Sequence, residues 1–304
     1  HKMYNQRYSK GMKCVSSLLL IISGLLSNEA VSQATLPMKA GQLVVTCFSG
    51  TSNNAVIPDP NNHVIGIIDT RDPLANGAVL GSNWVPPAGF MFHNEGSSDE
   101  WLAGNIGEVF GVTLDAEANP NIFTTATTVY GNFPPGPGNY GGVYRLDGNT
   151  GAISFTTIAG TGNASLGSVC HDLSSNGGSW LYVSNFEDGM VYRVDSASLV
   201  VQALSYDHGV AGRLAAALPV IPDPGTPDTL SPLGRRVWGV QVFDDRLYYA
   251  VWWEDKVHPS ALDANEVWSV ALDPVTGEFL PTTAQLEVTL PPRAPSMNWS
   301  LPVA

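Results

Sequence analysis

The sequence predicts an all-β fold, a β-propeller built of four-stranded antiparallel blades. A pair of strands recurs four times along the 304 residues, a third strand precedes the pair in three of these units, and a fourth strand follows it. The chain contains 31 Gly and 22 Pro, which supply turns, and is 44% hydrophobic but only 13% charged, which supplies a core. We therefore expect about four blades of a six- or seven-bladed propeller.

The repeated pair consists of two runs rich in β-branched and aromatic residues, and the second run ends in aspartate. The first runs are Leu43–Phe48, Ile122–Thr127, Leu181–Phe186 and Leu247–Trp252. The second runs are Val64–Asp69, Val143–Asp147, Val191–Asp195 and Val267–Asp273. A single blade cannot bury both of its faces, so we expect neighbouring blades to stack.

The strands that flank the pair complete the predicted blades. The innermost strands are Phe110–Asp115, Gly167–Asp172 and Trp238–Asp244, and the outer strands are Ala152–Ile158, Leu199–Tyr206 and Gln285–Leu290. The first unit lacks an innermost strand, and residues 295–304 resemble the start of another unit. We therefore expect residues 35–304 to form a propeller domain that is incomplete at its C-terminal end.

One predicted hairpin is "LYVSNFEDGMVYRVD", residues 181–195. Between its two strands, Glu187-Asp188-Gly189 provides the Asp-Gly pair that favours positive φ in a tight turn.

Residues 1–34 have the pattern of upstream residues followed by a secretory signal peptide. Lys13 follows Met12, the apolar run 15–26 comes next, and Ser32-Gln33-Ala34 forms a small-x-small cleavage site. A buried N-terminal helix is the alternative. The run is too short for a comfortable membrane span, so we expect a secreted, cell-surface or periplasmic protein without a membrane span in the mature chain.

The charge and the cysteines restrict the function further. With 27 acidic and 14 basic residues the formal net charge is −13, which repels nucleic acid. Cys14 leaves with the signal peptide. Cys47 and Cys170 form either one disulfide or two buried thiols, and their apolar strand surroundings favour buried thiols.

Two phrases carry a resemblance to a known superfamily. "LYVSNFEDGMVYRVD" and "NEVWSVALDPVTG" resemble the blades of NHL-like and SMP-30-like six-bladed propellers, and more narrowly those of exported bacterial propeller proteins. The resemblance covers residues 41–290. It implies the fold rather than the activity, because such propellers include lyases, lactonases and pure binding modules.

Two short motifs resemble ligand-binding motifs but lack the sequence context that binding requires. "GPGNYG", residues 136–141, follows two prolines and precedes a strand, so we interpret it as a loop and not as a dinucleotide site. "DAEANPN", residues 115–121, spaces its oxygens like a calcium loop but lacks the required Gly and Glu. Asp115, Asp172 and Asp244 share one repeat position, which favours side-chain capping of turns.

Four residues are candidates for a binding site: Trp253, Glu254, His171 and Asp172. His171 and Asp172 lie on a predicted innermost strand, where they suit either acid–base work or, as we favour, a structural hydrogen bond. Adjacent strand residues face opposite sides, so Trp253 is either exposed beside Glu254 or packed between blades. No nucleophile motif is present, and we expect no catalytic residues.

The leading hypothesis is an exported non-catalytic binding or scaffolding module. Its long loops 131–142, 208–236 and 254–264 are expected on one face, where a glycan or an extracellular protein would bind. The alternative is a metal-dependent hydrolase or lactonase of the SMP-30-like type. It would need one divalent cation, such as calcium, held by oxygens at the channel mouth, with Glu108 and Gln241 as further polar candidates. The leading hypothesis needs no cofactor.

Overall fold

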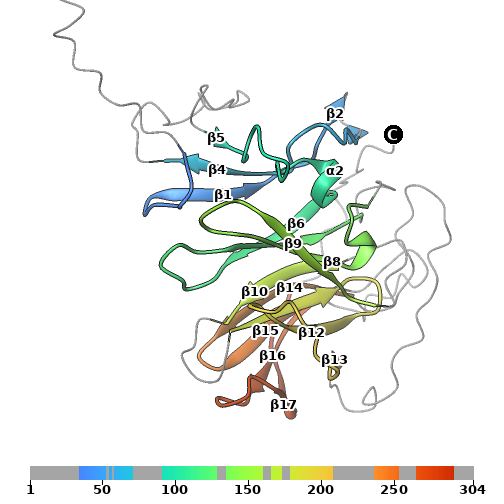
Figure 1. The fold of residues 1–304 in the computed structure, drawn as a ribbon. Coiled ribbons are helices and arrows are strands. Elements are labelled where there is room, and N and C mark those ends of the chain that lie inside the picture. The colour runs from blue at the N-terminus through green and yellow to red at the C-terminus, as the bar shows by residue number, and fades with distance from the viewer. Residues whose placement is uncertain are drawn as a thin grey trace, which may run out of the picture. The chain divides into compact units, whose positions relative to one another are not determined.

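The computed structural model describes residues 34–52, 55–56, 58–70, 91–128, 135–159, 166–172, 179–207, 236–252 and 265–290. All of them belong to one compact unit, Gln33–Ala304. The described chain is nearly all β and forms a propeller-like series of antiparallel sheets that follow one another in chain order (Figure 1). Its helical elements are α2 (Ala103–Ile106) and the 3-10 turn η2 (Asn139–Gly141), and neither these nor the small hairpin β2–β3 (Thr51–Ser52, Ala55–Val56) were expected.

We number the four large sheets blades 1 to 4. Blade 1 has three strands, β1 (Gln42–Thr46), β4 (Ile65–Asp69) and β5 (Met91–Phe92). Blade 2 consists of β6 (Val109–Leu114), β7 (Ile122–Ala126), β8 (Gly142–Leu146) and β9 (Ile153–Thr157). Blade 3 consists of β10 (Leu166–His171), β11 (Trp180–Asn185), β12 (Met190–Asp195) and β13 (Tyr206–Asp207). Blade 4 consists of β14 (Arg236–Phe243), β15 (Arg246–Trp252), β16 (Glu266–Leu272) and β17 (Phe279–Thr289).

The strand pairs and innermost strands confirm the predicted order, but the prediction of the outer strand of blade 3 was wrong. Residues 199–205 do not form the expected strand; β13 contains only Tyr206 and Asp207. Leu199 lies in the left-handed region (φ 59°), because it closes the turn that Asp195 begins. Only an isolated bridge between Val194 and Val201 continues the ladder toward β13.

The turn after β11 also differs from the expected tight hairpin. The loop between β11 and β12 has four residues, 186–189, and only Gly189 adopts a positive φ (77°). A two-residue turn with both residues at positive φ occurs instead between β14 and β15, at Asp244 (50°) and Asp245 (54°). Aspartate tolerates this region better than most side chains.

Three apolar cores lie between successive blades. Successive side chains of a strand point to opposite faces, so Leu181 packs toward blade 2 while Tyr182 packs toward blade 4. Their members include Ile65, Ile67, Ile122 and Tyr144 between blades 1 and 2, Phe123, Val143, Leu181 and Val183 between blades 2 and 3, and Tyr182, Tyr206, Tyr249 and Val251 between blades 3 and 4. The repeat is stabilised at its blade interfaces, as in other stacked-repeat proteins.

Hydroxyl groups of β1, β7 and β11 connect blades 1, 2 and 3 to the innermost strand of the following blade. Thr46, Thr125 and Ser184 occupy equivalent positions, where they pair with β4, β8 and β12, respectively. Their hydroxyls donate to Phe110 O (3.1 Å), Gly167 O (3.0 Å) and Trp238 O (2.6 Å), respectively. Blade 4 carries Ala250 at this position, so it has no such hydroxyl.

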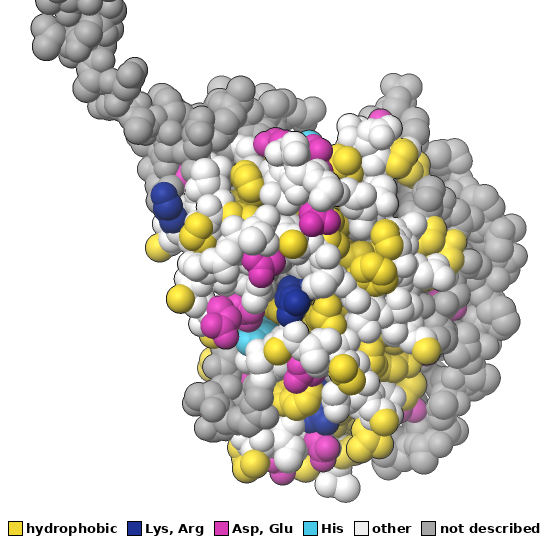
Figure 2. All heavy atoms as spheres, viewed as in Figure 1, with side chains coloured by type: hydrophobic (Ala, Val, Ile, Leu, Met, Phe, Trp, Pro, Cys, Tyr) yellow, Lys and Arg dark blue, Asp and Glu magenta, His cyan; other side chains and the backbone are white. Residues whose placement is uncertain are grey.

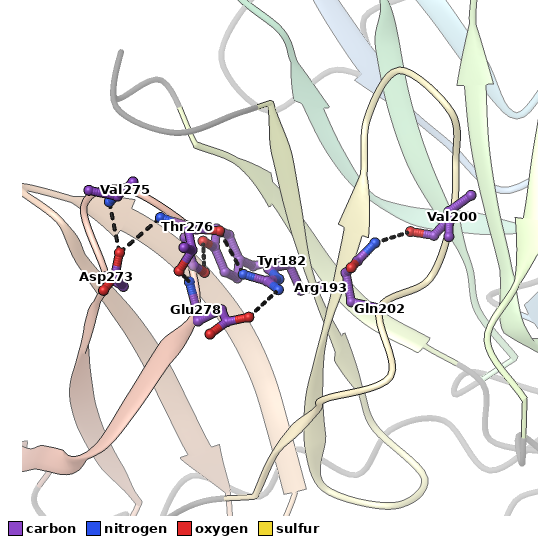
Figure 3. Close-up of polar contacts among 9 residues, drawn as sticks. Tyr182, Arg193, Val200, Gln202, Asp273, Val275, Thr276 and Glu278 are labelled. Carbon is purple, nitrogen blue, oxygen red and sulfur yellow. Dashed lines mark hydrogen bonds and ion pairs between the residues drawn. The ribbon is translucent and has the colours of Figure 1, made fainter.

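Arginines of the third strands form a second connection between blades. Arg193 in β12 donates from Nη1 to Thr276 O (2.8 Å) and contacts Glu278 (3.4 Å) in the turn before β17 (Figure 3). Arg145, at the equivalent position of β8, donates from Nη1 to Ala197 O (2.6 Å) in blade 3. The closing aspartates hold these turns, because Asp273 accepts hydrogen bonds from the backbone N–H groups of residues 275 and 276 (2.8 and 2.9 Å).

Candidate functional site

His171 ends β10 and is only 5% exposed. Its Nε2 lies 2.7 Å from Ser179 Oγ, and its backbone N–H donates to Thr113 Oγ1 in blade 2 (3.2 Å). Its ring is nearly parallel to that of Phe123, with centroids 6.3 Å apart. The strand alternation thus places His171 at the interface between blades 2 and 3.

Two serines extend the hydrogen bonding from His171. The Ser196 hydroxyl donates to Ser179 Oγ, and Ser196 N donates to Ser179 O (2.9 Å). Ser179 immediately precedes β11 and Ser196 immediately follows β12, so paired strands hold both close to the end of β10. The result is a chain of side-chain contacts from Ser196 through Ser179 to His171.

Burial lowers the pKa of His171 because the charged imidazolium loses its hydration; Asp115, Asp172 and Glu117 oppose this effect. A neutral imidazole beside a serine hydroxyl is the arrangement of a base with its nucleophile. Nδ1, however, is buried without a hydrogen-bond partner in the described part of the chain, so no carboxylate orients the ring there. The geometry therefore favours a structural role for His171.

The other polar candidates on or next to the innermost strands, Glu108 and Gln241, also make hydrogen bonds within the chain. Glu108 is 2% exposed and accepts hydrogen bonds from Ser49 N (3.1 and 3.3 Å) and from the Ser49 hydroxyl. Ser49 in turn accepts from Asp59 N (2.8 Å), so Glu108 fixes the segment after β1. Gln241 is exposed, and its Nε2 donates to Val242 O (3.1 Å). Within the ranges that the structure describes, no three His, Cys, Asp or Glu side chains are grouped to hold a metal ion.

The four candidate residues do not all fall in the described chain. Trp253 and Glu254 lie outside it, as do loop 254–264 and all of loop 208–236 except Arg236. The strand β15 ends at Trp252 opposite Arg236, the first residue of β14, whereas His171 is the last residue of β10. His171 and the end of β15 therefore lie at opposite ends of their blades. Asp172 is buried beside His171, and its N–H donates to Trp180 O (2.9 Å).

The described part of loop 131–142 supports its interpretation as a loop. Residues 139–141 form η2, directly before β8. The Gly136 backbone lies so close to Ile106 and Gly107 that a Cβ at residue 136 would come within 2.3 Å of the Ile106 carbonyl carbon. Glycine is needed here for close packing of two backbones and not for a phosphate. Asp115 likewise caps its own turn, accepting from Asn121 N (2.9 Å) and Asn121 Nδ2 (2.6 Å).

Sequence reasoning missed an acidic turn in blade 3. Asp188 accepts hydrogen bonds from the Tyr192 hydroxyl (2.6 Å) and from Met190 N (2.8 Å). Burial, followed by repulsion from Glu187, raises the pKa of Asp188 to about 6 despite these bonds. The signal in the sequence is the acidic pair next to Gly189, which by itself predicts only a turn.

A second missed feature is a pair of stacked imidazoles in blade 1. The rings of His63 and His93 lie 4.0 Å apart at an interplanar angle of 11°. His63 Nε2 lies 2.8 Å from Glu100 Oε1, and His93 Nδ1 lies 2.8 Å from Ile65 O. The pKa of His93 is lowered, chiefly by burial. The two histidines are 30 residues apart in the sequence, so no local motif predicts that they stack.

Comparisons with known proteins add little to this geometry. No family model and no curated protein matches the chain. A crystal structure of a protein from Lactobacillus plantarum is similar at 10% identity and a TM-score of 0.39, covering 83% of this chain and 53% of that one. The chain thus spans about half the length of that protein. Across the described residues, no helix is both long and apolar enough to cross a membrane.

Proposed function

We propose that this chain is an exported binding or scaffolding module without catalytic activity, and that its partner is a glycan or an extracellular protein. One observation carries the proposal: the Glu108 carboxylate and His171 Nε2, which the alternative hypothesis would use for chemistry, make hydrogen bonds inside the molecule. Both carboxylate oxygens of Glu108 accept hydrogen bonds from Ser49, and His171 Nε2 contacts Ser179. These groups meet their hydrogen-bonding needs within the fold and do not require a metal or a substrate to do so.

The connections between blades support the scaffolding part of the proposal. Three apolar cores, three hydroxyl contacts and two arginine contacts join successive blades. Rigid elements of this kind commonly present binding loops. Export rests on the signal-peptide pattern of residues 12–34.

The surface charge supports the class of partner. Figure 2 shows acidic side chains scattered among apolar and uncharged ones on the described part of one face, without a basic patch. Together with the net charge of −13, this disfavours polyanionic partners such as nucleic acid.

The test is a binding screen of the purified chain on arrays of glycans and of extracellular proteins. We expect saturable binding to at least one array member, unchanged by EDTA and retained in His171→Asn. Ser198→Ala, which alters an exposed turn hydroxyl, serves as a matched control. Absence of binding to every array member would contradict the proposal.

A further inference from the structure

Two aromatic side chains from separate blades meet over the innermost strand of blade 3. Phe110 lies in β6 and Trp238 in β14, and their ring centroids are 4.8 Å apart at an interplanar angle of 50°. The strand β10 packs against both β6 and β14. The contact therefore joins blades 2 and 4 across blade 3.

An irregularity in each strand turns these side chains out of the apolar cores. The β6–β7 register shifts between Val109 and Val112, and the β14–β15 register shifts between Val237 and Val240. Val109 and Val237 are 2% and 1% exposed, whereas Phe110, inside the irregular segment, is 38% exposed. A bulge re-aims a side chain in this way.

Glycine backbone lies against the Trp238 indole. A Cβ at Gly167 would lie 3.4 Å from Trp238 Cε3 and 3.0 Å from Trp238 O, so the indole rests on backbone where a side chain would intrude. Phe186, fully buried, contacts the indole edge-to-face with centroids 5.0 Å apart. Trp238 is thus fixed by its contacts with Phe186 and Gly167, while part of the Phe110 surface stays exposed.

We infer that Phe110 and Trp238 form a stacking site for a neutral sugar ring. This deepens the proposed binding function and rests on it. The apolar C–H face of a pyranose packs on aromatic rings, and fixed aromatic side chains lose little entropy when they bind. The acidic chain disfavours nucleobases, which would also stack but carry phosphates.

The test uses a printed array of neutral oligosaccharides that includes cellohexaose, chitohexaose and maltohexaose, followed by calorimetry on the best binder. We expect Phe110→Ala and Trp238→Ala to weaken binding at least 10-fold, and Trp238→Phe to retain part of it. The matched control is Phe243→Ala, an exposed phenylalanine (71%) at the other end of β14, which should leave affinity unchanged. Thermal unfolding of each variant separates loss of the site from loss of the fold.

The contrary outcomes are distinct. Binding to a glycan that folded Phe110→Ala and Trp238→Ala leave unchanged overturns the sugar site but keeps the proposed function. Binding only to a protein, even where the aromatic side chains of that protein make the contact, also overturns the sugar site and keeps the proposed function. Binding to no partner on any array overturns both.

Discussion

Arg193 of blade 3 joins its blade to blade 4 by donating from Nη1 to the carbonyl oxygen of Thr276, at 2.8 Å (Figure 3). The guanidinium also lies 4.4 Å from the centroid of the Trp180 ring, and its side chain is 6% exposed. Tyr182 donates to the next carbonyl of the same turn, Gly277 O (2.7 Å). One buried cation thus holds a turn of the neighbouring blade against its own.

Replacing Arg193 should weaken the interface between blades 3 and 4. We expect Arg193→Ala to lower the free energy of unfolding by about 2 to 4 kcal/mol, because it removes charged hydrogen bonds and aromatic contact at a buried site. Arg145→Ala, at the more exposed equivalent position, should cost less. Chemical denaturation measures both, and equal losses would contradict the role assigned to burial.

Removing the Ser184 hydroxyl should leave an inter-blade carbonyl without its donor. Ser184 is fully buried, donates to Trp238 O (2.6 Å) and accepts from Ser168 N (2.8 Å). We expect Ser184→Ala to cost about 1 to 3 kcal/mol of unfolding free energy, since both partly buried partners lose a bond. Ser184→Thr, which keeps the hydroxyl, and Thr46→Val, at the more exposed equivalent, should cost less. Denaturation curves that do not separate the three variants would contradict this ranking.

Asp188 should stabilise the fold at low pH and cease to do so near neutral pH. Its folded pKa, about 6, lies above the ordinary 3.8, so the contribution is complete below pH 3.8 and is lost as the pH rises through 6. Asp188→Asn should therefore gain stability relative to wild type between pH 4 and pH 7, by about 2 to 3 kcal/mol. The altered bond to Tyr192 changes the free energy of unfolding by the same amount at every pH, so it cancels when the two pH values are compared. A pH-independent difference would contradict the raised pKa.

His171 should have the opposite effect. Its pKa is lowered by burial, so its contribution is present above the ordinary value of 6.5 and is lost as the pH falls through the folded pKa. Thermal unfolding of His171→Asn should therefore depend less on pH between 7 and 5 than that of wild type. His93→Asn is the matched comparison, because burial also lowers that pKa. An unchanged pH dependence in His171→Asn would refute the assignment.

The two described cysteines should differ in reactivity. Both are free thiols, so the disulfide alternative is wrong, and so is the expectation that both are buried, because Cys47 is exposed just beyond the end of β1. Burial raises the pKa of Cys170 to about 12. Iodoacetamide on the native protein should label Cys47 and not Cys170, as peptide mapping would show. A disulfide-linked peptide containing both cysteines would contradict the structure.

The sequence predicted the blades because alternating apolar strands and their closing aspartates are local signals. It did not predict the connections between blades, because Arg193 and Thr276 lie 83 residues apart and only the fold brings them together. The strand predicted at residues 199–205 does not form, because capping by Asp195 places Leu199 in a turn, which outweighs its strand propensity. Among the candidate site residues, His171 was correctly expected on an innermost strand. Its contacts with Ser179 and, through it, Ser196 could not be predicted, because neither serine belongs to a recognisable sequence motif.

An assay of turnover tests the proposal that this chain binds a partner and does not catalyse a reaction. The purified chain, without and with added calcium, manganese or zinc, is assayed against a panel of lactones and esters, and its metal content is measured by mass spectrometry. We expect no hydrolysis above the buffer rate and no stoichiometric divalent ion. Hydrolysis that disappears in folded Glu108→Gln or His171→Asn would contradict it.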